Sequence, residues 1–485
     1  MLKYTSIMSI EHIRPREIIN LGQPDTLLIN VPATFQQGII PDDEEPPFGM
    51  LRIAVASEEY GYKPALLDAH RGKLTPSEID DVLYGLKPKS VGINPTSVNV
   101  PEAQEIAELC AHHGIPLILG GVHATLDPFT ALKEDFPMAL AVVKGKGEKA
   151  ILHILDDIKN GQRTEKRGVY YQNAETSRRD FADYYPLDEL PLIDQSRWVE
   201  NPLIGGTVGI NGQNVELIEI SLYETAGCPF QCTYCATPAL VGRNDGYKTY
   251  YRPNMDRILA STKLAVELGA NAIHFIDDMA FVNPGHFRKF ADGVEKLKLQ
   301  NQLYWRGMTR ASIIADKCSD EDLSILAQSG CWRIAMGVES GDEQILRRIK
   351  KGITTHQVRE AVSKLRAVGI PQVKAFFIMG FPEETLEQME TTRKFIMELK
   401  QLGLTDISIF QFKPYPGTEE WQHLQQTNPE VLENLYYIRH GGSTNIVNRK
   451  IAKDASLPDD LKIAAVPSKI VREMVVKTLE EFYGH

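Results

Sequence analysis

The chain has few cysteines, no long apolar run and no excess of basic residues. Six cysteines in 485 residues are too sparse for a disulfide framework, which is typical of small secreted folds. No stretch approaches the roughly 20 apolar residues of a membrane-spanning helix. The segment from Met1 to His12 lacks the apolar core and cleavage pattern of a signal peptide. These absences predict a protein of the reducing cytoplasm without a membrane span.

The charge and the length set further limits. A net charge of −11 opposes a nonspecific nucleic-acid binder, which would need a basic face. Apolar residues make up 43% of the chain and charged residues 24%, as in ordinary globular proteins. Because 485 residues exceed one ordinary domain, we expect two large domains, or two plus a small third. We expect no nucleic-acid partner.

Half of the cysteines lie in one short run. Cys228, Cys232 and Cys235 fall within eight residues, whereas the other three cysteines lie in apolar, periodic surroundings typical of a core. Thiolates hold iron–sulfur clusters, and a four-iron cluster normally takes four of them. A triplet without a local fourth cysteine therefore suggests a cluster with one iron left open for a ligand. A zinc knuckle would need a fourth ligand at short spacing, but the nearest downstream histidine is His274. A chance group of core cysteines agrees poorly with the flanking Gly, Pro and Gln.

This Cys-x3-Cys-x2-Cys spacing, with Tyr234 just before the third cysteine, resembles the signature of the radical S-adenosylmethionine (SAM) superfamily. The resemblance implies a 4Fe-4S cluster whose open iron binds the amino and carboxylate groups of SAM. It also implies that an electron from the cluster cleaves SAM to a 5′-deoxyadenosyl radical. A flavodoxin- or ferredoxin-type protein is the expected electron donor.

The first 150 residues alternate short apolar runs with helical patterns. Buried strands are predicted at 26–31, 64–68, 90–93, 116–119 and 140–143, and an amphipathic helix at 101–113. This alternation predicts a parallel, doubly wound sheet in a Rossmann-like α/β domain. Ligands of such sheets bind at the carboxyl ends of the strands.

The loops at those strand ends carry paired glycines and polar side chains. Together with Pro46-Pro47-Phe48-Gly49, these loops resemble the cobalamin-binding domain that precedes many radical SAM domains. The resemblance implies the following cobalamin-binding residues: Thr96, Ser97, Gly120, Gly121, His123, Gly145, Gly147 and Glu148.

This half departs from cobalamin-binding mutases, which place a cobalt-ligating histidine after the first strand. The corresponding segment, 32–38, contains no histidine. The run Asp68 to Gly72 looks similar but is one residue short and follows the second strand, so we interpret His70 as a surface or loop-anchoring residue. His123 is likewise expected to support its glycine loop rather than to ligate metal.

A second alternation begins at Val215. Strands are predicted at 215–222, 272–276, 303–306, 333–338, 373–378 and 407–410. Six strand–helix units are too few for the eight-fold barrel, so we expect an open partial barrel, which the resemblance also implies. The predicted domains are a cobalamin-binding domain at 1–150, a linker at 151–214, a radical SAM partial barrel at 215–440 and a helical C-terminal region at 441–485. The sequence leaves open whether that last region packs on the barrel or covers the substrate as a lid.

Polar residues recur where the predicted barrel strands end. SAM offers an ammonium group, ribose hydroxyls and a carboxylate, which need carboxylate, hydroxyl and arginine partners. The residues that offer this complement are Asp277, Asp278, Arg310, Glu339 and Ser340. Asp278 and Ser340 could instead be helix caps. The resemblance further assigns Gly380 and the Tyr234 backbone to the adenine, although Phe376 replaces the first glycine of that family element.

The two resemblances together imply an enzyme. Cobalamin and SAM cleavage in one chain point to methyl transfer from methylcobalamin to an unactivated carbon, or phosphorus, of a small-molecule substrate. A second possibility keeps the cofactors but replaces methylation with rearrangement, ring contraction or oxidative cyclisation. A third makes the chain a noncatalytic corrinoid or iron–sulfur carrier.

Overall fold

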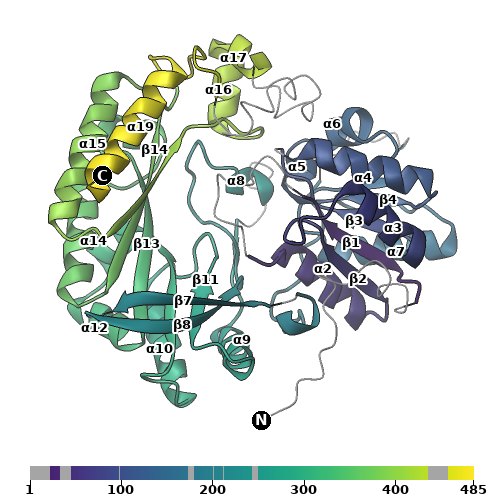
Figure 1. Cartoon of the computed structure of the whole chain (residues 1–485), viewed down its shortest axis with the longest axis horizontal. Helices are drawn as coiled ribbons and strands as arrows, with labels where there is room; N and C mark the ends of the chain where they lie inside the picture. The colour runs from purple at the N-terminus through teal and green to yellow at the C-terminus, as the bar shows by residue number, and fades with distance from the viewer. Residues whose placement is uncertain are drawn as a thin grey trace. The chain divides into compact units, whose positions relative to one another are not determined.

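The computed structural model describes residues 22–32, 45–97, 99–172, 180–199, 201–210, 212–242, 249–434 and 457–484. These residues form two compact units, with the change from the first to the second between Pro202 and Leu203 (Figure 1). Each unit has its own sheet and its own hydrophobic core. In the described part of the chain, no helix is long and apolar enough to cross a membrane.

The first unit is built on a sheet with the order β2-β1-β3-β4-β5-β6. The first five strands of the chain are parallel, and β6 pairs antiparallel with β5. Their order, 2-1-3-4-5, is that of doubly wound flavodoxin-like sheets, which bind ligands where the winding reverses between β1 and β3. The bounds are β1 Thr26–Asn30, β2 Pro64–Asp68, β3 Val91–Ile93, β4 Leu117–Leu119, β5 Ala141–Val143 and β6 Val169–Tyr171.

Helices cover both faces of this sheet, as the predicted doubly wound fold requires. α3 (Pro76–Leu86) and α4 (Val100–His112) share one apolar core with the strands. α7 (Glu148–Asn160) contributes to a second core with β5 and β6, and α2 (Phe48–Glu59) packs against it. The chain therefore continues in the same sheet beyond residue 150, because α7 and β6 belong to it. Three short helices, α5 Gly121–Leu126, α6 Pro128–Thr130 and η4 Ala131–Asp135, follow β4, and η5 Gln195–Arg197 follows β6.

The second unit contains a larger sheet with the order β15-β14-β13-β12-β11-β8-β7. In this sheet the strands β8, β11, β12, β13, β14 and β15 are parallel, and β7 forms an antiparallel hairpin with β8. In the described residues no pairing joins β15 to β7, so the sheet is open and the predicted partial barrel is confirmed. The bounds are β7 Leu203–Ile210, β8 Gln213–Leu222, β11 Ala272–Phe275, β12 Tyr304–Thr309, β13 Cys331–Glu339, β14 Gln372–Met379 and β15 Asp406–Gln411.

Helices line one face of this curved sheet (Figure 1). Alternate strand residues are buried against them, as in β14, where every second side chain belongs to the core. Local sequence sets the helix starts: Ser319, Thr354 and Thr385 each form a capping box with a residue three positions on. The bounds are α9 Met255–Glu267, α10 Pro284–Lys296, α11 Ala311–Lys317, α12 Asp320–Gln328, α13 Glu343–Arg348, α14 Thr355–Ala367 and α15 Leu386–Gln401.

The C-terminal helix α19 (Ser468–Tyr483) packs against α15 and the edge strand β15. The Tyr483 hydroxyl lies 3.1 Å from the Ile407 nitrogen and 3.0 Å from its carbonyl oxygen, so it satisfies backbone groups of that edge strand. Of the two roles left open by the sequence, packing therefore describes α19. Residues 441–456 of the predicted C-terminal region lie outside the described residues. The remaining elements are α8 Thr237–Leu240, α16 Glu419–Thr427, α17 Pro429–Asn434, β9 Ala226–Gly227 and β10 Tyr250–Tyr251.

Candidate active site

The cysteine loop leaves the carboxyl end of β8 and is held at its start by the short strand β9. Ala226 and Gly227 pair antiparallel with Tyr251 and Tyr250 of β10. The Thr225 N–H donates a hydrogen bond to the Asp277 carboxylate, which is fully buried at the end of β11. The first cysteine therefore follows a backbone segment that the protein fixes on two sides.

The acidic pair after β11 contacts both ends of this loop. Asp277 accepts from Thr225, and the exposed Asp278 accepts from the Thr237 hydroxyl at 3.3 Å. The sequence predicted these acids among the partners of SAM, with a helix cap as the alternative for Asp278. The cap hypothesis is wrong, because Asn283 caps α10 by accepting from the His286 N–H. A role toward SAM stays a prediction for both acids.

Tyr234 sits in a buried polar cluster inside the loop. The Lys351 ammonium lies 2.7 Å from a Glu339 carboxylate oxygen and 3.3 Å from the Tyr234 hydroxyl. Both charged side chains are less than a tenth exposed. Burial, followed by the charge of Glu339, raises the pKa of Tyr234 well above its usual value. The phenol therefore stays protonated and fixed beside the second and third cysteines.

The backbone at Glu339 is strained to allow this pair. Glu339 has a φ of +74°, and the register of β13 with β14 shifts between Gly337 and Glu339. A Cβ on Gly337 would lie 2.5 Å from the Glu339 carboxylate and 2.8 Å from the Lys351 ammonium. A larger residue at 337 would therefore displace the side-chain ends of this ion pair. Lys351 was missed by the sequence analysis, because it follows α13 and no local motif marks it.

Arg310 is a buried cation directed at the cysteine loop. Its side chain is 6% exposed, and its guanidinium carbon lies 3.9 Å from the centre of the Phe230 ring, between the first two cysteines. In the described part of the chain, its Nε has no hydrogen-bond partner. A buried arginine with a free N–H group can donate hydrogen bonds to a carboxylate.

Ser340 and Gly380 have partners inside the protein. The fully buried Ser340 hydroxyl lies 3.1 Å from the Thr392 hydroxyl and accepts from the Asp342 N–H. Asp342, not Ser340, caps α13, so the cap hypothesis for Ser340 is also wrong. Gly380 has a φ of +89° and donates its N–H to Glu384 at 2.6 Å. Contacts of Ser340 and Gly380 with SAM stay predictions.

The predicted cobalamin residues of the first unit lie at one edge of its sheet. The His123 ring joins the ends of two strands: its Nδ1 is 3.4 Å from the Ser97 hydroxyl, and its Nε2 is 2.9 Å from the Asp135 carboxylate. All three side chains are buried. Because a carboxylate can only accept, Nε2 donates to Asp135, and Nδ1 accepts from Ser97 in the neutral ring. These contacts give His123 the loop-supporting position that the sequence suggested.

The neighbouring loops at this edge are tied together in a similar way. Asn99 accepts from the Thr96 N–H and hydroxyl and donates to the Val31 carbonyl at the end of β1. The Gly145 N–H donates to the Thr125 hydroxyl. The segment that follows β1, from residue 33 to 44, contains no histidine and lies outside the described residues. That bound cobalamin lacks a histidine ligand from this motif stays a prediction.

Gly120, Gly121, Gly147 and Glu148 stand where helices begin rather than in open loops. α5 starts at Gly121 immediately after β4, with Gly120 as its cap. Gly121 has a φ of +79°, and a Cβ there would lie 3.0 Å from Asn94. Gly147 caps α7, which places Glu148 in its first turn. The predicted loops 120–125 and 144–148 are therefore strand-to-helix turns, because each helix begins within two to five residues of its strand.

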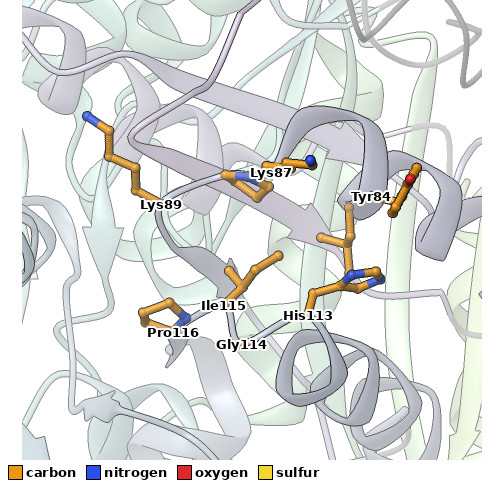
Figure 2. Close-up of a pocket in the computed structure, with 9 residues that line it drawn as sticks. Tyr84, Lys87, Lys89, His113, Gly114, Ile115 and Pro116 are labelled. Atoms are coloured by element: carbon orange, nitrogen blue, oxygen red, sulfur yellow. The ribbon is translucent and has the colours of Figure 1, made fainter.

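A pocket of about 390 Å³ lies elsewhere in the first unit (Figure 2). Its lining runs from the end of α3 to Lys89, shortly before β3, and from the end of α4 to Pro116, directly before β4. It includes Tyr84, Lys87, Lys89 and His113. These residues precede the strands, so the pocket lies at the amino ends, opposite the edge where such sheets bind ligands.

Comparison with known families identifies both edges. Residues 223–396 match the radical SAM superfamily, and residues 41–155 match the B12 binding domain. The chain therefore combines a B12 binding domain with a radical SAM domain. This confirms the family that the cysteine spacing and the glycine loops predicted. Such a chain is an enzyme, and its cofactors are a 4Fe-4S cluster, SAM and cobalamin.

Two relatives and one solved structure extend over most of this radical SAM chain. An uncharacterized methyltransferase, PH0819 of Pyrococcus horikoshii, is 26% identical and covers 90% of this chain and 91% of its own. The cytidylyl-2-hydroxyethylphosphonate methyltransferase of Streptomyces wedmorensis is 25% identical and covers 86% of each chain. The structure of the cobalamin-dependent SAM radical enzyme OxsB, with aqua-cobalamin and SAM bound, has a TM-score of 0.66 at 17% identity over 84% of this chain. This chain spans 62% of the OxsB chain, and the likeness shows the shared fold.

The radical SAM loop has the donors that a three-cysteine cluster needs. Cys228, Cys232 and Cys235 are free, partly exposed thiols on one loop. Burial raises the pKa of Cys228 to about 11 and also raises that of Cys235, so iron would have to displace the protons. The described residues hold no group of three His, Cys, Asp or Glu side chains placed for a single metal ion.

The cobalamin edge also offers unfilled acceptors. The Glu148 Oε2 and the Asn94 Oδ1 are buried and have no hydrogen-bond partner in the described part of the chain. A corrinoid carries amide side chains, whose N–H groups need such acceptors. The residues at this edge therefore fit the cofactor that the family implies.

Proposed function

We propose that this enzyme transfers a methyl group, through its cobalamin, to an unactivated carbon or phosphorus of a small-molecule substrate. The observation that carries the proposal is the similarity to a named phosphonate methyltransferase over 86% of both chains, which includes both cofactor domains. The cofactors supply SAM cleavage and methyl transfer. The protein supplies their positions and excludes water.

Different residues of the site bind the cluster, bind SAM and position the cysteine loop. We propose Cys228, Cys232 and Cys235 as the cluster ligands and Arg310 as the partner of the SAM carboxylate. Asp277 and Asp278 fix the two ends of the cysteine loop. The ion pair of Lys351 and Glu339 fixes Tyr234 between the last two cysteines. A loop held at its start, middle and end keeps the cluster in one place while SAM binds.

The remaining proposed contacts are those of the strand ends. Glu339, Ser340, Gly380 and Tyr234 would line the SAM site. Thr96, Ser97, Gly120, Gly121, His123, Gly145, Gly147 and Glu148 would line the cobalamin site. The protein regions 1–150 and 215–440 would carry the two cofactors, and a flavodoxin- or ferredoxin-type protein would supply the electron.

The test is an anaerobic reconstitution with iron, sulfide and hydroxocobalamin, followed by reduction and incubation with SAM and candidate substrates. Methylation predicts two coproducts, S-adenosylhomocysteine and 5′-deoxyadenosine. Deoxyadenosine without S-adenosylhomocysteine would support rearrangement or cyclisation instead. Failure to retain cobalamin would exclude the methylation mechanism, and absence of any SAM cleavage would indicate a noncatalytic carrier.

A further inference from the structure

Thr233, between the second and third cysteines, is held by two distant elements. Its N–H donates to the Ile349 carbonyl at 3.0 Å, at the end of α13. Its hydroxyl donates to the Glu420 carboxylate of α16 at 2.6 Å, and its carbonyl accepts from the Glu420 N–H at 3.2 Å. All three hydrogen-bonding groups of Thr233 are therefore used, and two of them bind one residue.

Glu420 is built into its place. It is 5% exposed, and its second carboxylate oxygen lies 3.8 Å from the Arg348 guanidinium. Arg348 in turn donates to the Pro382 carbonyl at 2.5 Å, in the segment that follows β14. A carboxylate that accepts a short hydroxyl bond beside a cation makes a charge-assisted contact, which is stronger than a neutral one.

α16 follows directly on the segment after the last barrel strand. Thr418 caps α16 by accepting from the Trp421 N–H, and its hydroxyl donates to the Tyr415 carbonyl at 2.7 Å. Burial lowers the pKa of Lys413 at the start of this segment, which begins at the carboxyl end of the sheet. A short, bonded path thus runs from the segment at 413–418 to the cysteine loop.

We propose that Glu420 is a positioning residue for the iron–sulfur cluster. It clamps the loop between Cys232 and Cys235 through Thr233 and joins that loop to the segment after β15. The clamp keeps the third cysteine and Tyr234 in the position that SAM binding requires. A shift of the segment at 413–418 would therefore move the cysteine loop that holds the cluster. This inference rests on the cluster site proposed above.

The experiment measures SAM binding to the reconstituted, reduced full-length protein. The readout is the change in the electron paramagnetic resonance spectrum of the cluster as SAM is added, together with iron per chain. Glu420→Gln removes the charge, and Thr233→Val removes the hydroxyl at similar shape. Each should raise the SAM concentration for half-maximal spectral change by about tenfold, the effect of losing one charge-assisted hydrogen bond.

Two further variants separate positioning from a general loss of structure. Thr233→Ser restores a hydroxyl and should return the titration close to that of the unaltered protein. Glu419→Gln changes the adjacent carboxylate, which is half exposed and pairs with Lys350 at 2.5 Å, and should leave the titration unchanged.

Two results of these titrations would overturn the proposed clamp. Wild-type SAM titrations for Glu420→Gln and Thr233→Val, or a Thr233→Ser protein as impaired as Thr233→Val, would overturn the clamp. If Glu420→Gln does not fold, the comparison of SAM titrations between Thr233→Val and Thr233→Ser still tests the clamp. A cluster that fails to form in the unaltered protein would instead reject the site itself.

Discussion

The two parallel sheets of this chain present different chemistry at their carboxyl edges. In the second unit, that edge is rich in buried charges, including Asp277, Arg310, Glu339 and Lys351. In the first unit, the corresponding edge joins its loops through hydroxyl, imidazole and amide groups, centred on His123. Both edges follow the same topological rule for ligand binding.

The difference matches the ligands proposed for the two edges. SAM and the cluster are compact and carry formal charges, so their site needs charged partners that are themselves fixed by pairing. Cobalamin is large and rich in amides, so its site needs shaped loops and hydrogen-bond acceptors. One edge is therefore organised around ion pairs, and the other around hydrogen bonds of hydroxyl, imidazole and amide groups in which Asp135 supplies a carboxylate acceptor. Four predictions test how far the two edges are independent.

The largest effect is expected from Cys232→Ala. It should remove iron from the reconstituted protein and lower SAM cleavage to the level without enzyme, because the loop then has two thiolates instead of three. Cobalamin retention should persist, since the other edge is intact. Iron analysis, cobalamin absorbance and 5′-deoxyadenosine measurement check this. The control is Cys318→Ala, a change in the core, which should leave the iron content unchanged. Retained SAM cleavage in Cys232→Ala would reject the ligand assignment.

The second-largest effect is expected from breaking the buried ion pair of Lys351 and Glu339. Lys351→Ala leaves the Glu339 carboxylate buried without its cation, and we expect the free energy of unfolding of the second unit to fall by about 3–5 kcal/mol. Chemical denaturation checks this value. The double variant Lys351→Met with Glu339→Gln carries no uncompensated charge and should recover most of the loss. A double variant as unstable as the single one would contradict this account.

The pH dependence of stability should reveal Glu384. Burial raises the pKa of this carboxyl to about 7, despite hydrogen bonds from the Gly380 and Phe381 N–H groups and the nearby Arg348. The folded state therefore binds the proton more tightly than the unfolded state, and stability is lost as pH rises from about 5 through 7.

The matched comparison is Glu384→Gln, which cannot titrate. Relative to this variant, the free energy of unfolding of the unaltered protein should fall by roughly 2–3 kcal/mol between pH 5 and 8. Denaturant titrations across this range check the slope. Parallel pH profiles for the two proteins would show that the Glu384 pKa is not raised.

The smallest effect is expected at the edge around His123. His123→Ala leaves the Asp135 carboxylate and the Ser97 hydroxyl without their shared partner, which should cost about 1–3 kcal/mol in the first unit. Cobalamin retention after gel filtration should fall, whereas iron per chain should not change. Loss of iron in this variant would show that the two edges are coupled.

Strong local patterns made most of the fold predictable. Apolar runs bounded by Gly, Pro or Asp marked β1 to β5 and the parallel strands of the barrel, because a strand buried on both faces has few polar residues. β6 was not predicted, since its three residues follow a charged stretch that indicates a turn. β7 falls in the predicted linker at 151–214, because its glycines also suit a flexible segment.

The candidate site was predictable only where chemistry is local. The three cysteines share one loop, so their spacing alone indicated a cluster. Lys351 and Glu420 gave no such signal, because they meet Tyr234 and Thr233 across 117 and 187 residues. For Asp278 and Ser340 the local pattern was misleading. Each was a candidate helix cap, but Asn283 caps α10 and Asp342 caps α13.

The sequence by itself determined the family, the cofactors and the two parallel sheets. These follow from short-range facts: thiolate spacing, glycine turns and the period of apolar residues. Tertiary structure alone decided what holds the cysteine loop, how Lys351 meets Glu339 and what α19 does for the edge strand. The physical reason is that buried charges and open backbone groups must find partners, and those partners come from whichever elements the fold brings near.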